Sequence, residues 1–300
     1  MVSSIATSPA VDLSGLPAPD IIDQPSFETR LAAKIATLVG LVPEFDALLE
    51  SDPAIKLIEA DSYDEMLLAQ AFNDSARSLL LAYATGGALD HLGSLMDVAR
   101  LELVPANLET GDPAVMESDS EYRARILIAP HSFSVAGPEL AYVYHARRAD
   151  SDVLDASATS PNPGEVLISI LSRTGDGTAP AGTIAAVDTL LQSNAIRPLG
   201  DDVTVQSAEI VGFNINAELW LFAGPDSLLI LQTATAALEK YLATTKRLGR
   251  DVTRSAIIAA LHVAGVQRVD LIDPVDDVVL TLLQAGHPVN ITITIAGTAE

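Results

Sequence analysis

SDPAIKLIEADSYDEMLLAQAFNDSARSLLLAYATGG, residues 51–87, predicts one long helix, and this helix decides the N-terminal half of the fold. Asp52 stands at the N-cap position, Pro53 occupies the first turn, and Gly86-Gly87 is the predicted end. At 1.5 Å per residue such a helix is a rod of roughly 45 Å, which is long for a compact domain. Its apolar residues lie on more than one face, so it needs partner helices from this chain or another.

The predicted contact stripe of this helix recurs at steps of three and four residues. A polar group, Asn73, Asp74 and Arg77, interrupts the helix. These three residues either pair on a solvated surface for a few tenths of a kcal/mol or set the register inside a helical bundle. Five leucines widen the apolar surface beyond one seam: Leu57, Leu67, Leu68, Leu80 and Leu81. The candidate interface residues on this helix are Ile55, Ile58, Met66, Phe72, Leu79, Tyr83, Asn73, Asp74 and Arg77.

Alternating helix and strand patterns follow Pro138, so the predicted fold class is α+β. An N-terminal all-helical region with one long helix is followed by two small mixed α/β units. We divide the chain into a flexible N-terminal arm at 1–25, a helical bundle-forming region at 26–100, a connector with a short helix at 101–137, a first α+β domain at 138–208 and a second at 209–300.

The second half contains a strictly alternating strand at 213–222. Alternation places successive side chains on opposite faces of a sheet. The more polar face carries Trp220, the only tryptophan, which we therefore propose as a subunit contact. The apolar face carries Phe213, Ile215, Ala217, Leu219 and Leu221. The other predicted strands are 152–158, 165–172, 203–207, 268–272 and 288–295, and the predicted helices are 139–148, 184–193, 228–242 and 253–264.

The composition excludes several classes of function. The formal charge is −23, and residues 1–120 carry 5 Lys or Arg against 20 Asp or Glu. This charge repels a phosphate backbone, so nucleic acid is excluded as the main ligand. No apolar run reaches the roughly 18 residues of a membrane span, and no N-terminal signal peptide is evident, which predicts a soluble protein without a membrane partner. The absence of cysteine removes disulfides, thiolate metal sites and cysteine nucleophiles.

Asp201 and Asp202 are the sharpest candidates for chemistry, because neighbouring carboxylates can hold a metal or divide acid and base roles. We interpret them instead as turn residues that bond their own backbone before a strand. The turn Gly175–Gly182 begins as GxG, but Pro180 replaces the third glycine and no Gly-Lys-Ser/Thr follows. The sequence therefore predicts no catalytic residue, no cofactor and no metal. A hydrolase or nucleotide-dependent enzyme using Asp201/Asp202 or this turn remains the alternative.

Several segments together resemble the baseplate J-like family of contractile phage tails and related injection machines. Their order and spacing carry the resemblance, which covers roughly residues 27–297. The segments are DPAIKLIEADSYDEMLLAQAFNDSARSLLLAYATGGALDHLGSLMDVAR, ESDSEYRARI, GEVLISIL, RPLGDDVTV, FNINAELWL and GRDVTRSAIIAALHVAGVQRVDLIDP.

The resemblance implies a non-enzymatic subunit of the baseplate wedge, located in the tail baseplate of the virion. It implies four partners: a second copy of the chain in a different conformation, a tail protein I-like subunit, the small sheath-initiating wedge subunit, and the central hub or spike. The N-terminal helices would form a three-chain bundle, and the C-terminal domains would close an inner ring whose opening triggers sheath contraction. Two conformations need joints, and we predict hinges at 101–118 and 128–138. A non-phage helical adaptor is the other alternative.

Overall fold

The computed structural model describes residues 17, 21, 26–44, 52–107, 109–133, 138–224 and 226–298. These residues form two compact units. The helical unit holds the described residues up to Arg100 together with Ser118–Arg123, and the sheet unit holds Leu101–Glu117 and the described residues from Ala124 onward. Apart from Pro17 and Ile21, the N-terminal arm expected at 1–25 lies outside the described residues.

The helical unit is built around α1 (Phe27–Leu41), α2 (Pro53–Ser78) and α3 (Gly86–Ser94). Side-chain caps define two of the helix starts, and the one at Asp52 confirms the sequence prediction. The Ser26 hydroxyl accepts from the Thr29 N–H, and the Asp52 carboxylate accepts from the Ala54 N–H ahead of Pro53. Such caps satisfy amide groups that have no partner inside a helix. The helix α4 (Asp119–Ile128) crosses the division between the units at Arg123.

The expected end of the long helix is wrong, because α2 stops at Ser78 and Gly86 begins α3 instead. The intervening chain turns, with the amides of Tyr83 and Ala84 both bonded to the Leu80 carbonyl. The Arg123 guanidinium donates to two other carbonyls of the same turn, those of Leu81 and Ala84, each at 2.7 Å. Contacts from a distant residue thus stabilise a turn where local helix propensity favours continuation.

The first sheet of the sheet unit has the order β3-β4-β5, with β3 (Val153–Thr159), β4 (Glu165–Ser172) and β5 (Asp202–Ser207). β3 and β4 are antiparallel, while β4 and β5 are parallel. A parallel pair needs a crossover, and α6 (Ala181–Leu191) supplies it. Helix α5 (Glu139–Ala149) packs on β3.

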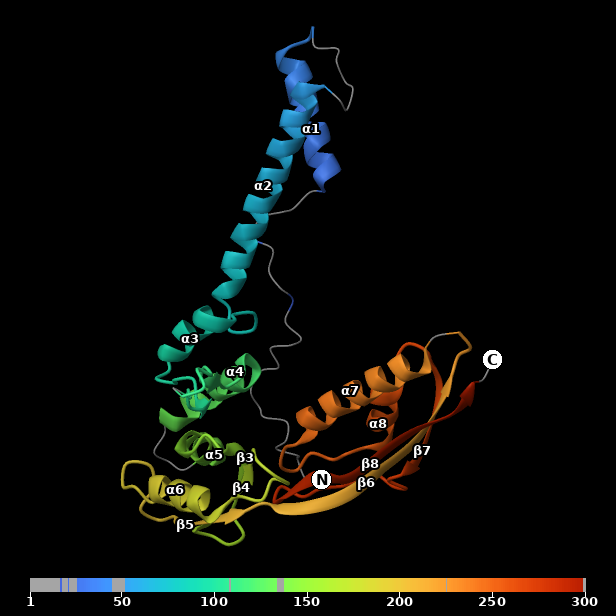
Figure 1. Cartoon of the computed structure of the whole chain (residues 1–300). Helices are drawn as coiled ribbons and strands as arrows, with labels where there is room; N and C mark the ends of the chain where they lie inside the picture. Colours follow the sequence, from blue (N-terminus) through green and yellow to red (C-terminus); the bar gives the residue numbers. More distant parts are fainter. Residues whose placement is uncertain are drawn as a thin grey trace. The chain divides into compact units, whose positions relative to one another are not determined.

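The second sheet has the order β7-β6-β8, with β6 (Glu209–Leu221) between β7 (Val266–Asp273) and β8 (Gln284–Thr298). Helices α7 (Ser227–Thr245) and α8 (Arg254–Leu261) cover one face (Figure 1). Burying one large aliphatic side chain contributes roughly 1.5–3 kcal/mol, so this core is the main stabilising element of the sheet. The predicted apolar face is confirmed, since the core includes Phe213, Ile215, Ala217, Leu219 and Leu221.

The sequence misses the pair β1 (Glu102–Val104) and β2 (Val115–Met116), which is antiparallel and lies within the predicted connector. Strands of three and two residues are too short to show a hydrophobic period. Part of the second predicted hinge, residues 134–137, lies outside the described residues. In the part of the chain that is described, no helix is long and apolar enough to cross a membrane. The same residues contain no cluster of three or more histidine or acidic side chains suited to a metal.

Candidate partner-binding surface

Helix α1 runs antiparallel along α2, and ion pairs fix the alignment. The Arg30 guanidinium lies 2.9 Å from the Glu65 carboxylate, and the Lys34 ammonium lies 2.6 Å from Asp61 and 2.8 Å from Glu65. Because Arg30 meets the later residue of α2 and Lys34 also reaches the earlier one, the two helices run in opposite directions. The carboxylates of Asp61 and Glu65 raise the pKa of Lys34 above its ordinary value. These ion pairs fix the register between α1 and α2, and each adds little to the free energy of unfolding because its carboxylate is exposed to solvent.

One seam of α2 is buried within the helical unit, at Ile55, Ser62, Ala69 and Asn73. The first three are seven residues apart and the fourth follows after four, which is the spacing of a heptad seam. Ser62 donates to the Ile58 carbonyl at 2.7 Å, and the Asn73 side-chain oxygen accepts from the Ile21 N–H at 3.0 Å. The hydrogen bonds allow these small polar side chains to be buried.

Another face of α2, about 115° around an ideal helix from the buried seam, carries an exposed apolar stripe made of Leu57, Leu68 and Phe72 and continued by the C-cap residue Leu79. Their exposed fractions are 72%, 64%, 64% and 74%. At 100° per residue on an ideal helix, these four positions fall within an arc of about 60°. Four large apolar side chains on one narrow face, with most of their surface in water, are typical of a helix that binds another chain.

The structure divides the predicted interface residues of α2 between two faces. Ile55 is buried, whereas Phe72 and Leu79 belong to the exposed apolar stripe. The three residues of the predicted polar group also lie in different environments. Asn73 is buried, while Arg77 lies 3.6 Å from Asp74 at the helix surface. The residues Ile58, Met66 and Tyr83 are half-buried.

Leu57 and Leu68 complete the stripe but are absent from the predicted contact set. Their spacing of eleven residues, three full helical turns, is the signal in the sequence that places them with Phe72. The role of every one of these residues in binding stays a prediction.

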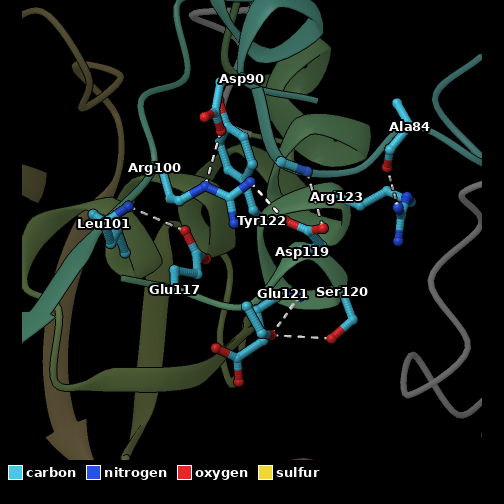
Figure 2. Close-up of polar contacts among 12 residues, drawn as sticks. Ala84, Asp90, Arg100, Leu101, Glu117, Asp119, Ser120, Glu121, Tyr122 and Arg123 are labelled. Atoms are coloured by element: carbon cyan, nitrogen blue, oxygen red, sulfur yellow. Dashed lines mark hydrogen bonds and ion pairs between the residues drawn. The ribbon is translucent and has the colours of Figure 1, made fainter. Parts of the chain in front are cut away.

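A compact ionic cluster holds the chain beyond the C-terminal end of α2 (Figure 2). The Arg100 guanidinium lies 2.8 Å from Asp90 and 2.7 Å from Asp119, and it stacks over the Tyr122 ring at 4.7 Å. The buried Tyr122 hydroxyl donates to the Val98 carbonyl at 2.7 Å. Arg100 holds the pKa of the Asp119 carboxyl below its usual value. The cluster ties α3 to the start of α4 within the helical unit.

Gly93 shows how tightly α3 and α4 approach in this cluster. A Cβ at this position would overlap the Tyr122 hydroxyl group, so only glycine fits. Asp119 also accepts from the Gly86 N–H at 3.1 Å, which anchors the first residue of α3. The end of α2 is therefore followed by a fixed structure, and the exposed stripe is presented on a helix whose C-terminal end is anchored.

Trp220 lies half-buried on the face of β6 that is opposite to the core, as alternation predicts. Its indole N–H donates to the Asp270 carboxylate at 2.9 Å, and the Arg268 guanidinium stacks on its ring at 5.0 Å. The side chain is thus held by its neighbours on β7. Its role as a subunit contact stays a prediction.

The Asp201 side chain does not bond its own backbone, and the expectation of a self-capped turn is wrong for it. Its carboxylate accepts from the Tyr142 hydroxyl at 2.7 Å, while its carbonyl accepts from Arg197 at 2.9 Å. Asp202 is the first residue of β5, and its N–H donates to the Gly164 carbonyl at 2.7 Å. The two aspartates therefore have different roles. The Asp201 carboxylate connects α5 to the loop before β5, and Asp202 begins β5.

The glycine-rich turn is also occupied by contacts within the chain. The Lys246 ammonium donates to the carbonyls of Arg173 and Gly175 at 3.1 and 3.2 Å, and the Ala179 N–H donates to the Ser207 hydroxyl at 2.9 Å. A phosphate cradle needs such amides to point at an open site. This turn serves as the connection from β4 to α6.

Replacing Tyr142 with phenylalanine is expected to destabilise the sheet unit by about 1–2 kcal/mol, because it removes a hydrogen bond to a charged group. Tyr142 is 2% exposed, whereas Asp201 is half-buried and can regain water, which limits the loss. Burial and the bond to Asp201 raise the pKa of Tyr142, so the hydroxyl stays a donor at neutral pH. Urea unfolding followed by tryptophan fluorescence measures the change, and an unchanged midpoint would contradict it.

Comparisons with known proteins identify the family of the chain. Three family models match the chain in order: the baseplate J-like N-terminal domain at residues 50–107, the baseplate J-like central domain at 134–207, and the baseplate J-like protein C-terminal domain at 213–296. Baseplate protein J of Escherichia phage P2 is 45% identical, over 97% of this chain and 100% of that protein.

A solved structure also matches, with a weaker likeness. It is the cryo-EM structure of the anti-feeding prophage baseplate, 6-fold symmetrised, at 15% identity and a TM-score of 0.39. The match covers 59% of this chain and 43% of that chain. A likeness of this size adds nothing to the assignment that the sequence matches support.

Proposed function

The chain belongs to the baseplate J-like family, and we propose from this premise that it is a wedge subunit of a contractile-tail baseplate, within the inner ring around the hub. As a family member it is a structural component of the phage tail baseplate and not an enzyme. It therefore acts in the virion among other baseplate proteins. The proposal concerns which contacts it makes there and how they couple ring opening to sheath contraction.

The exposed apolar stripe on α2 is the observation that supports this proposal. Its four side chains are between 64% and 74% exposed, although each would stabilise a bundle core if covered. We propose that α2 of this chain packs with α2 of a second copy in another conformation and with a helix of a tail protein I-like subunit. Because the seam at Ile55, Ser62, Ala69 and Asn73 is already buried within the chain, the stripe is the exposed apolar face available to both.

The sheet unit would supply the ring contacts. The three-stranded order β7-β6-β8 makes β7 and β8 the edge strands, and Trp220 stands on the face that α7 and α8 leave open. An edge strand presents unpaired backbone groups that can bind a neighbouring chain. We propose that neighbouring sheet units, the small sheath-initiating wedge subunit and the central hub or spike contact these parts.

Two conformations of one chain require segments that change shape, and the proposed hinges remain 101–118 and 128–138. Within the first, β1 and β2 form a paired ladder whose register shifts between Glu102 and Val104. A rigid-body change around such a connector keeps both units intact. If the two copies superimpose through both segments in an assembled wedge, the hinge proposal fails.

Co-expression with a tail protein I-like subunit tests the proposed function. We expect a stable complex containing two copies of this chain and one of the partner, measured by size-exclusion chromatography with light scattering. The chain expressed alone is expected to elute as a monomer or weak oligomer. Separate elution of the two proteins at micromolar concentration would contradict the wedge assignment.

A further inference from the structure

A cavity of about 260 Å³ lies inside the sheet unit, and three of the chain's 17 basic residues line it. Arg147 comes from α5, while Arg247 and Arg250 come from the segment after α7. The remaining wall is largely apolar and comes from Ala124, Ile128, Leu140, Val143, Ala156, Leu248 and Leu282. Three guanidinium groups around one small cavity are unexpected in a chain with a net charge of −23.

Arg147 is the residue that most needs a partner. Its Nε is buried and has no hydrogen-bond partner among the described residues. Burial lowers the pKa of Arg147, and the nearby charge of Arg247 acts in the same direction, while Asp155 opposes both. A buried guanidinium donor without an acceptor carries a desolvation cost that an anion would remove.

Two acidic residues, Asp155 and Glu139, also line the cavity. The Asp155 carboxylate is engaged, because one of its oxygens accepts from the Leu248 N–H at 3.1 Å. Glu139 has a buried oxygen without a partner among the described residues, and burial raises its pKa.

We propose that this cavity binds one small, multiply charged oxyanion of the phosphate class. Arg147, Arg247 and Arg250 supply donors from two segments that are about a hundred residues apart in sequence, and the volume suits a single small ion. The bound ion joins α5 of the first sheet's layer to the segment between α7 and α8. It thereby stabilises the packing between the two α+β parts of the sheet unit, and the site is independent of the helical surface.

Thermal unfolding of the full chain in inorganic phosphate, against sodium chloride at equal ionic strength, tests the proposal. We expect a saturable rise of the melting temperature with phosphate. Arg250 is exposed, so Arg250→Gln leaves the core intact and is expected to weaken the apparent affinity about ten- to hundredfold, as for one charge-assisted bond. Arg147→Met is expected to abolish the saturable response without lowering the melting temperature in chloride.

Arg148→Gln is the matched control, because Arg148 is the next residue of α5, is exposed and does not line the cavity. It is expected to respond to phosphate as the unchanged chain does. Phosphate also stabilises proteins generally by exclusion from their surface, and that rise is common to every variant and does not saturate. The proposal is overturned if Arg250→Gln keeps the full saturable response, or if the unchanged chain has none.

Discussion

Arg125→Met is expected to destabilise the sheet unit by about 3–5 kcal/mol, the range for removing one partner of a buried ion pair. The side chains of Arg125 and Glu117 are 2% and 1% exposed. Two parallel bonds join them, from Nε at 2.8 Å and from Nη2 at 2.6 Å. Glu117 also accepts from the Leu101 N–H at 3.2 Å, so its carboxylate organises the entry into β1. Without Arg125 this carboxylate is left buried without its counter-charge.

Chemical unfolding followed by Trp220 fluorescence reports the transition of the sheet unit, since the chain has one tryptophan and it lies on β6. The double variant Glu117→Leu/Arg125→Met is expected to lose less stability than Arg125→Met alone, because it removes both buried charges together. As a control, Arg268→Met breaks the exposed pair with Asp270 and is expected to cost less than about 1 kcal/mol. A double variant less stable than Arg125→Met alone would contradict this account.

The core face of β6 and the bounds of β4 were predictable because their signal is local. Alternation over Phe213–Leu221 identifies the core face directly, and β4 begins and ends at the predicted residues, Glu165 and Ser172. A side-chain period of two requires no knowledge of the rest of the chain. The start of α2 was predictable for the same reason, since Asp52 and Pro53 are adjacent capping signals.

The end of α2 was not predictable, because it depends on Arg123, which lies about forty residues further along the chain. The same holds for the Arg100 cluster, for the pair of Glu117 with Arg125, and for the three arginines of the cavity. Periodicity also shows which residues of α2 share a face, but not which face another helix covers. The structure decides this, because it buries Ile55, Ser62, Ala69 and Asn73 and leaves Leu57, Leu68, Phe72 and Leu79 exposed.

Phe72→Asp is expected to weaken binding of the tail protein I-like subunit by about 3 kcal/mol, roughly a hundredfold, if the stripe is the proposed bundle face. Phe72 is 64% exposed in the isolated chain, so the variant is expected to fold with unchanged helix content. In the bundle the new carboxylate would be buried without a partner, which is costly in an apolar interface. Co-purification and titration with the partner measure the loss, and circular dichroism checks the fold.

Gln70→Asp adds the same charge two residues earlier and separates a specific contact from a general effect of charge. Gln70 is exposed on α2, and at 100° per residue it lies roughly 160° around the helix from Phe72. We expect Gln70→Asp to bind the partner as the unchanged chain does. Equal losses in both variants would mean that charge repulsion, and not burial of the stripe, governs assembly. Undiminished binding by Phe72→Asp would remove the stripe from the interface while leaving the family assignment intact, because that assignment depends on the sequence matches alone.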